Sequence, residues 1–339
     1  MDPLIDRRAR RVEYMRVSLT DRCNMRCTYC MPEEGIAYGP RTELLSLEEI
    51  VAVCAAFARW GVRRVRLTGG EPTLRRGLVE LVAALSSVRL PTGEALEVVM
   101  TTNGERLPEL ALPLREAGLT GLTVSLDSLD AARFRRITRR GSLERVLAGL
   151  DAAARAGFRG IKLNTVAVRG FNDDEFAAIA RFAWAQGFVP RYIEMMPMAS
   201  GDLFVPGQLM PAAELRHHVA EALGATLVPD DGVGVRGAGP AQYYRVTAGP
   251  YAGRRLGTIA AMTENFCASC NRLRLSANGQ LHGCLARDDT GDLRSALRSG
   301  SPERLEAVVR EVLGNKRDQH GFSIDGSGGP AKAMVSIGG

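Results

Sequence analysis

The stretch EYMRVSLT at residues 13–20 has the alternation of a β-strand, and it runs directly into three closely spaced cysteines in DRCNMRCTYC at residues 21–30. Strand-like patterns recur downstream, each separated from the next by a helix-like pattern, at residues 62–68, 95–102, 122–128, 160–168 and 188–196. Strands that alternate with helices predict parallel βαβ units. Six units, with no dinucleotide-binding fingerprint at the first turn, favour an α/β fold of the incomplete (β/α)₆ barrel type.

The helix expected over residues 46–61 has clear end signals. Ser46 is a good N-cap, Glu49 completes a capping box, and Gly61 ends the helix. After Pro197 glycine and proline become frequent and the regular alternation stops. We therefore divide the chain into a barrel domain at residues 1–200 and a second region at residues 201–339.

Composition excludes several classes of protein. The chain has 339 residues, of which 45% are hydrophobic and 24% charged, as in ordinary globular proteins. We find no apolar run long enough to cross a membrane and no secretory signal, so we expect a cytoplasmic protein without a membrane partner.

The basic residues are nearly all arginine. Among 44 lysines and arginines only Lys162, Lys316 and Lys332 are lysines. The guanidinium group suits phosphate or carboxylate ligands. A nucleic-acid partner is not expected, because the arginines are scattered and only 6% of residues are aromatic. The basic run RRARR at residues 7–11 is expected to be a solvated arm.

Cysteine spacing is the most specific signal. Six of the seven cysteines form two triplets, and Cys54, in the middle of an apolar helix, is expected to be a small buried hydrophobe. Tight triplets in a chain without an export signal indicate metal rather than disulfides. The triplets are Cys23, Cys27 and Cys30, then Cys267, Cys270 and Cys284.

The first triplet has the spacing C-x₃-C-x₂-C. Three thiolates on one short loop can hold three irons of a four-iron cluster, which leaves the fourth iron open to an outside ligand. Structural zinc normally has four protein ligands, and none of the four histidines is near this loop. A disulfide would leave an odd thiol.

The second triplet encloses a predicted hairpin. Asn278-Gly279 is a two-residue turn signal, which brings Cys284 near Leu273 and requires the strand ladder to break near Cys270. Zinc with His282 as a fourth ligand remains a rival to a second iron–sulfur cluster. Arg272 and Arg274 are two apart and so share one face of the strand, where they suit an anionic substrate.

The segment CNMRCTYC resembles the C-x₃-C-x-Φ-C signature of the radical S-adenosylmethionine superfamily. The resemblance implies a [4Fe-4S] cluster whose open iron binds S-adenosyl-L-methionine, and reductive cleavage of that cofactor to a 5′-deoxyadenosyl radical. TGGEP at residues 68–72 resembles the superfamily's GGE motif. Carried over by position, the cofactor contacts are Tyr29, Gly70, Ser125 and Met196, with Met195 as the alternative at the last position.

The chain also resembles the family within that superfamily that cyclises GTP for molybdenum cofactor biosynthesis. This resemblance rests on both triplets together, with CNRLRLS at 270–276, GPAQYY at 239–244 and the final Ile337-Gly338-Gly339. The resemblance implies a second [4Fe-4S] cluster that binds the guanine, an electron donor, a following enzyme (MoaC) and a tail that enters the active site. It places GTP on Arg16, Arg66, Thr101, Lys162, Arg272 and Arg274.

Two other functions are kept open, namely a radical peptide maturase with auxiliary clusters and a zinc-binding nucleic-acid module.

Lys162 points into the predicted barrel, where we expect it to have a partner because an unpaired buried charge is costly. Residues 232–237 match G-x-G-x-x-G without a flanking strand and helix, so we interpret them as a loop. The oligomeric state is open, with a homodimer as one option.

Overall fold

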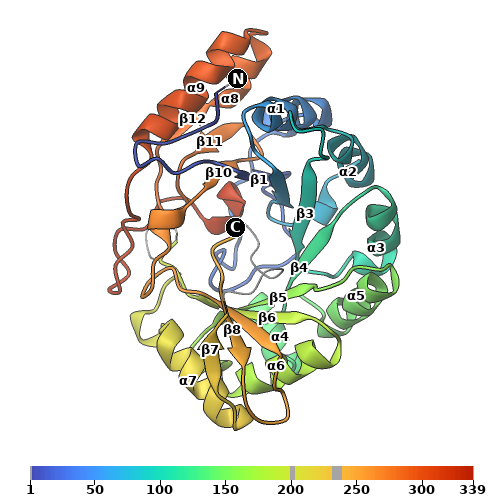
Figure 1. Cartoon of the computed structure of the whole chain (residues 1–339), viewed down its shortest axis with the longest axis vertical. Helices are drawn as coiled ribbons and strands as arrows, with labels where there is room; N and C mark the ends of the chain where they lie inside the picture. The colour runs from blue at the N-terminus through green and yellow to red at the C-terminus, as the bar shows by residue number, and fades with distance from the viewer. Residues whose placement is uncertain (1, 199–202, 231–238, 339) are drawn as a thin grey trace.

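A computed structural model describes residues 2–198, 203–230 and 239–338. It contains one curved sheet of twelve strands, with most of the helices on its outer side (Figure 1). The strand order is β12-β11-β10-β1-β2-β3-β4-β5-β6-β9-β8-β7, so the sheet has two ends and forms an open barrel. The loop that we predicted at residues 232–237 lies outside the described residues.

The six predicted strands are present and parallel, which confirms the incomplete barrel. They are β1 (Tyr14–Ser18), β2 (Arg64–Thr68), β3 (Glu97–Thr102), β4 (Gly121–Ser125), β5 (Lys162–Ala167) and β6 (Val189–Glu194). The helices between them are α1 (Leu47–Arg59), α2 (Leu78–Ser86), α3 (Leu107–Glu116), α4 (Ala131–Thr138), α5 (Leu143–Arg155) and α6 (Phe176–Ala185).

The start of α1 has the predicted capping box. Ser46 Oγ accepts a hydrogen bond from Glu49 N at 3.1 Å, and Glu49 Oε2 accepts one from Ser46 N at 2.8 Å. Gly61 follows the helix with φ +98°, a conformation that favours glycine. Cys54 in the same helix is fully buried in the core, as expected.

Helix α4 was not predicted. Its eight residues, AARFRRIT, contain three arginines, so the apolar positions that mark a helix are few. Asp130 caps it by accepting a hydrogen bond from Arg133 N at 2.7 Å. The β4–β5 crossover therefore contains two helices instead of one.

The region after residue 200 joins the same sheet. Strand β9 pairs with β6 and β10 pairs with β1, both parallel, so the C-terminal region adds one parallel strand to each side of the six (Figure 1). From the sequence we predicted only one hairpin, that of β10 and β11, among the elements of this region. They are α7 (Ala212–Leu223), β7 (Leu227–Pro229), β8 (Gln242–Val246), β9 (Arg255–Ile259), β10 (Arg272–Leu275), β11 (Gln280–His282), β12 (Thr290–Asp292), α8 (Leu293–Arg298) and α9 (Pro302–Asn315).

The hairpin between β10 and β11 differs from the predicted one. Arg274 pairs with His282 and Leu275 with Leu281, which leaves a three-residue loop in which Gly279 has φ +82°. The two-residue turn was therefore wrong by one residue. Continued to its end, this register carries Cys284 toward the position opposite Arg272 rather than Leu273. The expected break is present, since β10 begins only after Cys270.

The two faces of the parallel strands differ in character. Residues that point outward are buried under the helices, such as Val17, Leu67 and Met100. Many of the residues that point inward are polar or charged, and the register aligns Arg16 with Arg66 and Thr101 with Thr123. Barrel interiors are normally packed with branched apolar side chains. This polar interior is built to hold a ligand instead.

No helix among the described residues is long and apolar enough to cross a membrane.

We predict that Leu273→Ala destabilises the whole barrel. Leu273 is fully buried in the core cluster that also contains strands from the first half of the chain, and a buried Leu→Ala change costs ~2–5 kcal/mol of unfolding free energy. Thermal unfolding is the measurement. The control is Leu112→Ala, where the side chain is 56% exposed. An equal Tm for both variants would contradict the shared core.

Candidate active site

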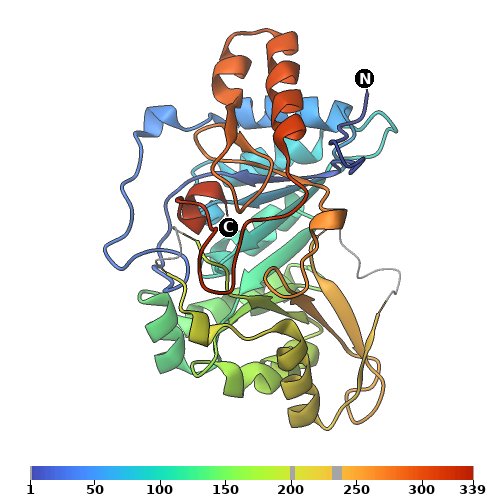
Figure 2. The same ribbon diagram turned by 90° about the vertical axis from the view of Figure 1, so that its left-hand side faces the viewer.

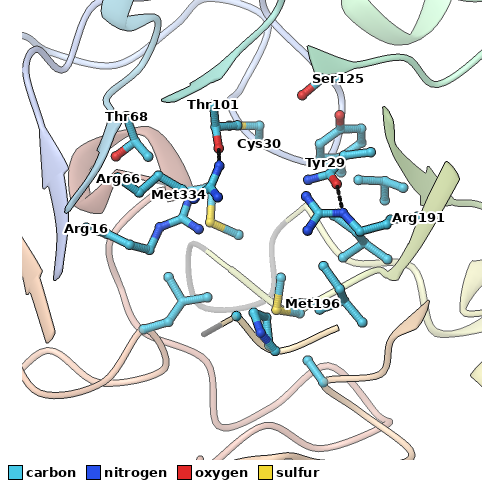
Figure 3. Close-up of a pocket in the computed structure, with 18 of the residues that line it drawn as sticks. Arg16, Tyr29, Cys30, Arg66, Thr68, Thr101, Ser125, Arg191, Met196 and Met334 are labelled. Atoms are coloured by element: carbon cyan, nitrogen blue, oxygen red, sulfur yellow. Dashed lines mark hydrogen bonds between the residues drawn. The ribbon is translucent and has the colours of Figure 1, made fainter. Parts of the chain in front are cut away.

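A cavity of about 320 Å³ lies inside the open barrel. Its lining comes from both halves of the chain, and Figure 3 shows Arg16 and Arg66 reaching into it from one side and Arg191 from the other. Every residue predicted to hold a cofactor or the substrate lines it. They are Arg16, Cys23, Cys27, Tyr29, Cys30, Arg66, Gly70, Thr101, Ser125, Lys162, Met196, Cys267, Cys270, Arg272, Arg274 and Cys284.

The first cysteine triplet lies on a loop of free thiols. Burial raises the pKa of Cys23 to about 11 and that of Cys30 to about 12, and it raises the pKa of Cys27 well above its usual value. No three His, Cys, Asp or Glu residues in the described part of the chain are arranged to hold a single metal ion. Three cavity-lining thiols with no fourth protein ligand fit a cluster that spreads them over separate irons.

Two glycines explain how this loop is held. Gly70 N donates to Thr20 O at 2.7 Å, directly beneath the cysteine loop. A Cβ atom on Gly69 would lie 2.6 Å from Thr20 O, and one on Gly70 would lie 2.3 Å from Arg22 O. Gly70 therefore lies in close contact with the backbone that leads into Cys23, where a side chain would not fit.

Glu71, the last residue of the GGE motif, is a structural acceptor. It is 1% exposed, and its two oxygens accept hydrogen bonds from Thr102 Oγ1 at 2.7 Å, Asn103 N at 2.7 Å and Thr73 N at 3.0 Å. Burial raises its pKa, and these bonds oppose that effect. Glu71 thus ties the end of β2 to the end of β3.

Asp127, which follows β4, also links the ends of neighbouring strands. Its carboxylate accepts a hydrogen bond from the Tyr29 hydroxyl at 2.7 Å and one from Val166 N at 2.8 Å. Burial raises its pKa to about 6, against the effect of these two bonds. Asp127 therefore fixes Tyr29, and with it the cysteine loop, over the ends of β4 and β5.

Glu194, at the end of β6, ties in the C-terminal region. It accepts hydrogen bonds from Ala212 N and Met262 N, both at 2.7 Å, and from Thr263 N at 3.0 Å. The three carboxylates that line the cavity, Glu71, Asp127 and Glu194, are thus all engaged in holding strand ends together.

The cations of the cavity are not balanced by these acids. Arg66 donates to Thr101 Oγ1 and Thr123 Oγ1, both at 3.0 Å, and to the Tyr14 hydroxyl, which are neutral acceptors. Burial, followed by the charge of Arg274, lowers the pKa of Arg16 well below its usual value. The lining is therefore strongly positive and suits a polyanion.

Lys162 has no ion pair among the described residues, so the expected partner was wrong. Burial and the charges of Arg191, Arg66 and Arg64 lower its pKa to about 8. Arg64 itself is paired with Glu97 at 2.6 Å. At the cavity wall the Lys162 amine therefore lies among guanidinium groups, and no described residue forms an ion pair with it.

Arg191 was missed in the sequence. It is 7% exposed and donates to Asn164 Oδ1 at 3.0 Å and Thr123 Oγ1 at 3.2 Å (Figure 3). A usable signal existed, because strand alternation puts Arg191 on the inward face of β6. No sequence signal marks Asp127 or Glu194, whose partners lie on distant segments.

The second cysteine triplet lies in a more positively charged environment than the first. Cys270 Sγ lies 3.6 Å from Arg272 Nη2 and 3.5 Å from Lys316 Nζ. Burial alone would raise the pKa of Cys270, but these two charges lower it to about 6. The protein here stabilises a thiolate before any metal binds, and this fits a thiolate-ligated centre. His282 does not line the cavity, and burial lowers its pKa to about 3.

The basic run at residues 7–11 is not wholly solvated. Arg10 is 8% exposed, pairs with Asp6 at 2.6 Å, and donates to Cys267 O at 2.7 Å and Arg317 O at 2.9 Å. The expected solvated arm was therefore wrong at this position. Arg10 anchors the N-terminal segment to the backbone of the second triplet.

The C-terminal tail contributes Met334 and Val335 to the cavity lining, and Figure 2 shows this last segment, in red, near the middle of the molecule. Gly338 O accepts hydrogen bonds from Arg274 Nη1 at 3.1 Å, Thr68 Oγ1 at 3.2 Å and Arg16 Nε at 3.3 Å. Gly338 has φ +70°, and a Cβ atom there would lie 2.5 Å from Thr68 Oγ1. Gly339 lies outside the described residues.

Met196 and Met195 both line the cavity. Met195 is 3% exposed and packs in an apolar cluster with Ile137 and Phe204. Met196 is half-buried, and Figure 3 shows its side chain on the cavity wall. Met196 is therefore the more available of the two for a ligand.

Two family profiles match this chain. The Radical SAM superfamily matches residues 17–183, and Molybdenum Cofactor Synthesis C matches residues 189–322. The GTP 3′,8-cyclase of Rhodopseudomonas palustris is 43% identical over 324 residues, which cover 95% of this chain and 91% of that protein. The GTP 3′,8-cyclase of Mesorhizobium japonicum is 43% identical, covering 95% of this chain and 94% of that protein.

Among solved structures, SuiB of Streptococcus suis bound to its precursor peptide SuiA aligns with a TM-score of 0.50. The identity is 15%, over 62% of this chain and 45% of SuiB. This likeness shows the barrel fold alone.

We predict that Gly70→Ala prevents assembly of the first metal site. A Cβ atom 2.3 Å from Arg22 O must displace the cysteine loop, so iron bound per chain after anaerobic reconstitution should fall markedly. The control is Gly207→Ala, because a Cβ atom there meets nothing within 4 Å. Full iron content in Gly70→Ala would show that the tight contact is not needed.

Proposed function

Because the chain belongs to the GTP 3′,8-cyclase family of radical S-adenosylmethionine enzymes, we propose that its barrel cavity holds S-adenosyl-L-methionine and GTP between two [4Fe-4S] clusters. The chain acts in molybdenum cofactor biosynthesis, and its reaction converts GTP to (8S)-3′,8-cyclo-7,8-dihydroguanosine 5′-triphosphate. The observation that carries the assignment of residues is the single cavity that both cysteine triplets and the cations line.

The first site serves the radical cofactor. Cys23, Cys27 and Cys30 hold the cluster that, with S-adenosyl-L-methionine bound, supplies the 5′-deoxyadenosyl radical for removal of the 3′ hydrogen of GTP. Tyr29, Gly70, Ser125 and Met196 bind this cofactor. The bond from Tyr29 to Asp127 keeps the cysteine loop in place while the site reacts.

The second site serves the substrate. Cys267, Cys270 and Cys284 hold the second cluster, which binds the guanine, while Arg16, Arg66, Thr101, Lys162, Arg272 and Arg274 bind the ribose and triphosphate. Arg191 adds a further positive charge from the opposite side of the cavity. A triphosphate would balance cations for which the described residues of the cavity provide no free carboxylate.

Orientation and exclusion of water complete the contribution of the protein. No strong base is needed to remove a hydrogen atom, but the reacting atoms must be held close and dry. The tail supports this, since Met334 and Val335 add apolar side chains to the cavity wall. The division at residues 1–200 and 201–339 then separates the part that holds the radical-generating cluster from the part that holds the substrate cluster, while both parts contribute residues that bind GTP.

Three further assignments complete the proposal. The enzyme is cytoplasmic, its product passes to MoaC, and an electron donor reduces the first cluster. The sequence identity to curated cyclases along 95% of the chain supports the pathway assignment.

Anaerobic turnover tests the function. With reconstituted enzyme, S-adenosyl-L-methionine and dithionite, we expect 5′-deoxyadenosine to rise on addition of GTP and a cyclised nucleotide to form. Cys23→Ala should abolish both products, whereas Cys270→Ala should abolish the nucleotide but retain slow 5′-deoxyadenosine formation. If 5′-deoxyadenosine forms equally with and without GTP, the substrate assignment is contradicted.

We predict that GTP binding weakens as the pH rises through about 8. The amine of Lys162 has a pKa of about 8 in the free enzyme, so its positive charge is present below that pH and lost above it. Isothermal titration at pH 7 to 9 measures the effect. Lys162→Arg keeps the charge and should flatten the profile.

Tyr14 requires a matched control in this experiment. Burial alone would raise its pKa, but Arg66, Arg16 and Arg272 lower it to about 8, so its phenolate would also repel GTP at high pH. Tyr14→Phe removes that titration. If Tyr14→Phe flattens the profile and Lys162→Arg does not, Lys162 is not the titrating group.

A further inference from the structure

We propose that the C-terminal end of α4 is the docking surface for a small acidic one-electron carrier protein that serves the first cluster. This rests on the proposed function, since cleavage of S-adenosyl-L-methionine consumes one electron. The surface is the α4 basic patch, which consists of Arg135, Arg136, Arg139 and Arg140.

The end of α4 touches the cysteine loop directly. Arg26 N donates to Thr138 O and Thr28 N donates to Ile137 O, both at 3.0 Å. Arg26 and Thr28 flank Cys27, so α4 holds the backbone on both sides of a predicted cluster ligand. A protein seated on this helix end is therefore close to the first cluster site.

Arg139 strengthens this connection. Its Nη1 donates to Arg26 O and to Met31 O, both at 3.1 Å, so one side chain spans the loop that carries Cys27 and Cys30. Its backbone has φ +60°, which L-residues rarely adopt. We treat Arg139 as a positioning residue and leave it out of the test.

The other three arginines are exposed and lack ion pairs within the described residues. Arg135 donates only to Arg140 O at 2.9 Å, and Arg136 lies over the Phe171 ring at 5.2 Å. On the same helix Arg133, by contrast, is paired with Asp174 and Glu175. The only acid paired with the patch within the described residues is Glu33, 3.8 Å from Arg139.

This charge pattern fits an acidic protein surface. Exposed, unpaired guanidinium groups on a helix steer an oppositely charged partner and accelerate its association. The patch does not line the barrel cavity, so substrate binding leaves it free. Phe171 is covered by Arg136 and offers no free ring on which a nucleic-acid base could stack.

A second basic surface is the rival. It lies beside the second triplet and is lined by Arg7, Arg8, Arg287 and Arg317, but also by Asp289 and Asp318. Arg8 is already paired with Asp318. Its mixed charge, and its place beside the substrate cluster, make it the weaker candidate.

The electron balance is simple. The reduced carrier is oxidised by one electron, and the cluster on Cys23, Cys27 and Cys30 is reduced by one electron. No bond or proton changes in this step. The same electron then enters the cleavage of S-adenosyl-L-methionine.

The test is charge reversal, Arg136→Glu with Arg140→Glu, in the reconstituted holoenzyme. The probe is an acidic plant-type [2Fe-2S] ferredoxin, and its Kd is measured by titration calorimetry. We expect the Kd to rise about tenfold or more at ~0.1 M salt, and the difference to vanish at ~1 M salt, where charges are screened within ~3 Å. Turnover with reduced ferredoxin should fall in parallel.

Matched variants separate charge from damage. Arg136→Lys with Arg140→Lys keeps the charge and should keep the Kd, whereas Arg304→Glu with Arg310→Glu makes the same reversal on α9, at the opposite end of the molecule (Figure 1), and should have no effect. Iron content and dithionite-driven turnover should be unchanged in all of them.

The outcomes are distinguishable. If dithionite and GTP give no cyclised nucleotide in the unaltered enzyme, the proposed function fails. If they do, and the Kd is unchanged by reversal on α4, the docking surface is overturned. Loss of ferredoxin binding in Arg7→Glu with Arg317→Glu, but not in the α4 variant, would overturn it in favour of the rival face.

Discussion

The parallel pairing of β10 with β1 is the constraint on which the site depends. It sets Arg274 beside Arg16 and Arg272 beside Tyr14, and it brings the second triplet to the barrel that carries the first. Burial lowers the pKa of both Arg16 and Arg274. Repulsion between like charges lowers each further, from Arg274 on Arg16 and from Arg272 on Arg274. The carbonyl oxygen of Gly338 lies between the two cations, where it accepts hydrogen bonds from Arg16 Nε and Arg274 Nη1.

The barrel divides its charged residues between two tasks. The acids at the strand ends, Glu71, Asp127 and Glu194, accept hydrogen bonds from neighbouring strands and loops and link the ends of adjacent strands. The cations point into the cavity with few charged partners. The ends of neighbouring strands are thus linked by buried carboxylates, and few of the cavity's cations have a carboxylate partner among the described residues.

Much of this could be predicted from local sequence. The alternation in residues 13–20 and its five repeats gave the parallel strands, and the cysteine spacings gave two loops that line one cavity. Short-range rules failed where the outcome depends on distant segments. The Asn278-Gly279 signal does not determine the hairpin register, since pairing of β11 with β12 also bears on it. Arg10 is buried against the backbone of the distant residues 267 and 317, and α4 adds bonds to the cysteine loop to the burial of Phe134 and Ile137.

The most direct test of the central claim, that one cavity sets GTP against the radical cofactor, is transfer of the substrate hydrogen. The enzyme is turned over with GTP deuterated at the 3′ carbon, and the 5′-deoxyadenosine released is analysed by mass spectrometry to measure this hydrogen transfer. The account predicts that deuterium appears in 5′-deoxyadenosine. If the nucleotide is consumed and the 5′-deoxyadenosine carries no deuterium, the assigned substrate position is contradicted.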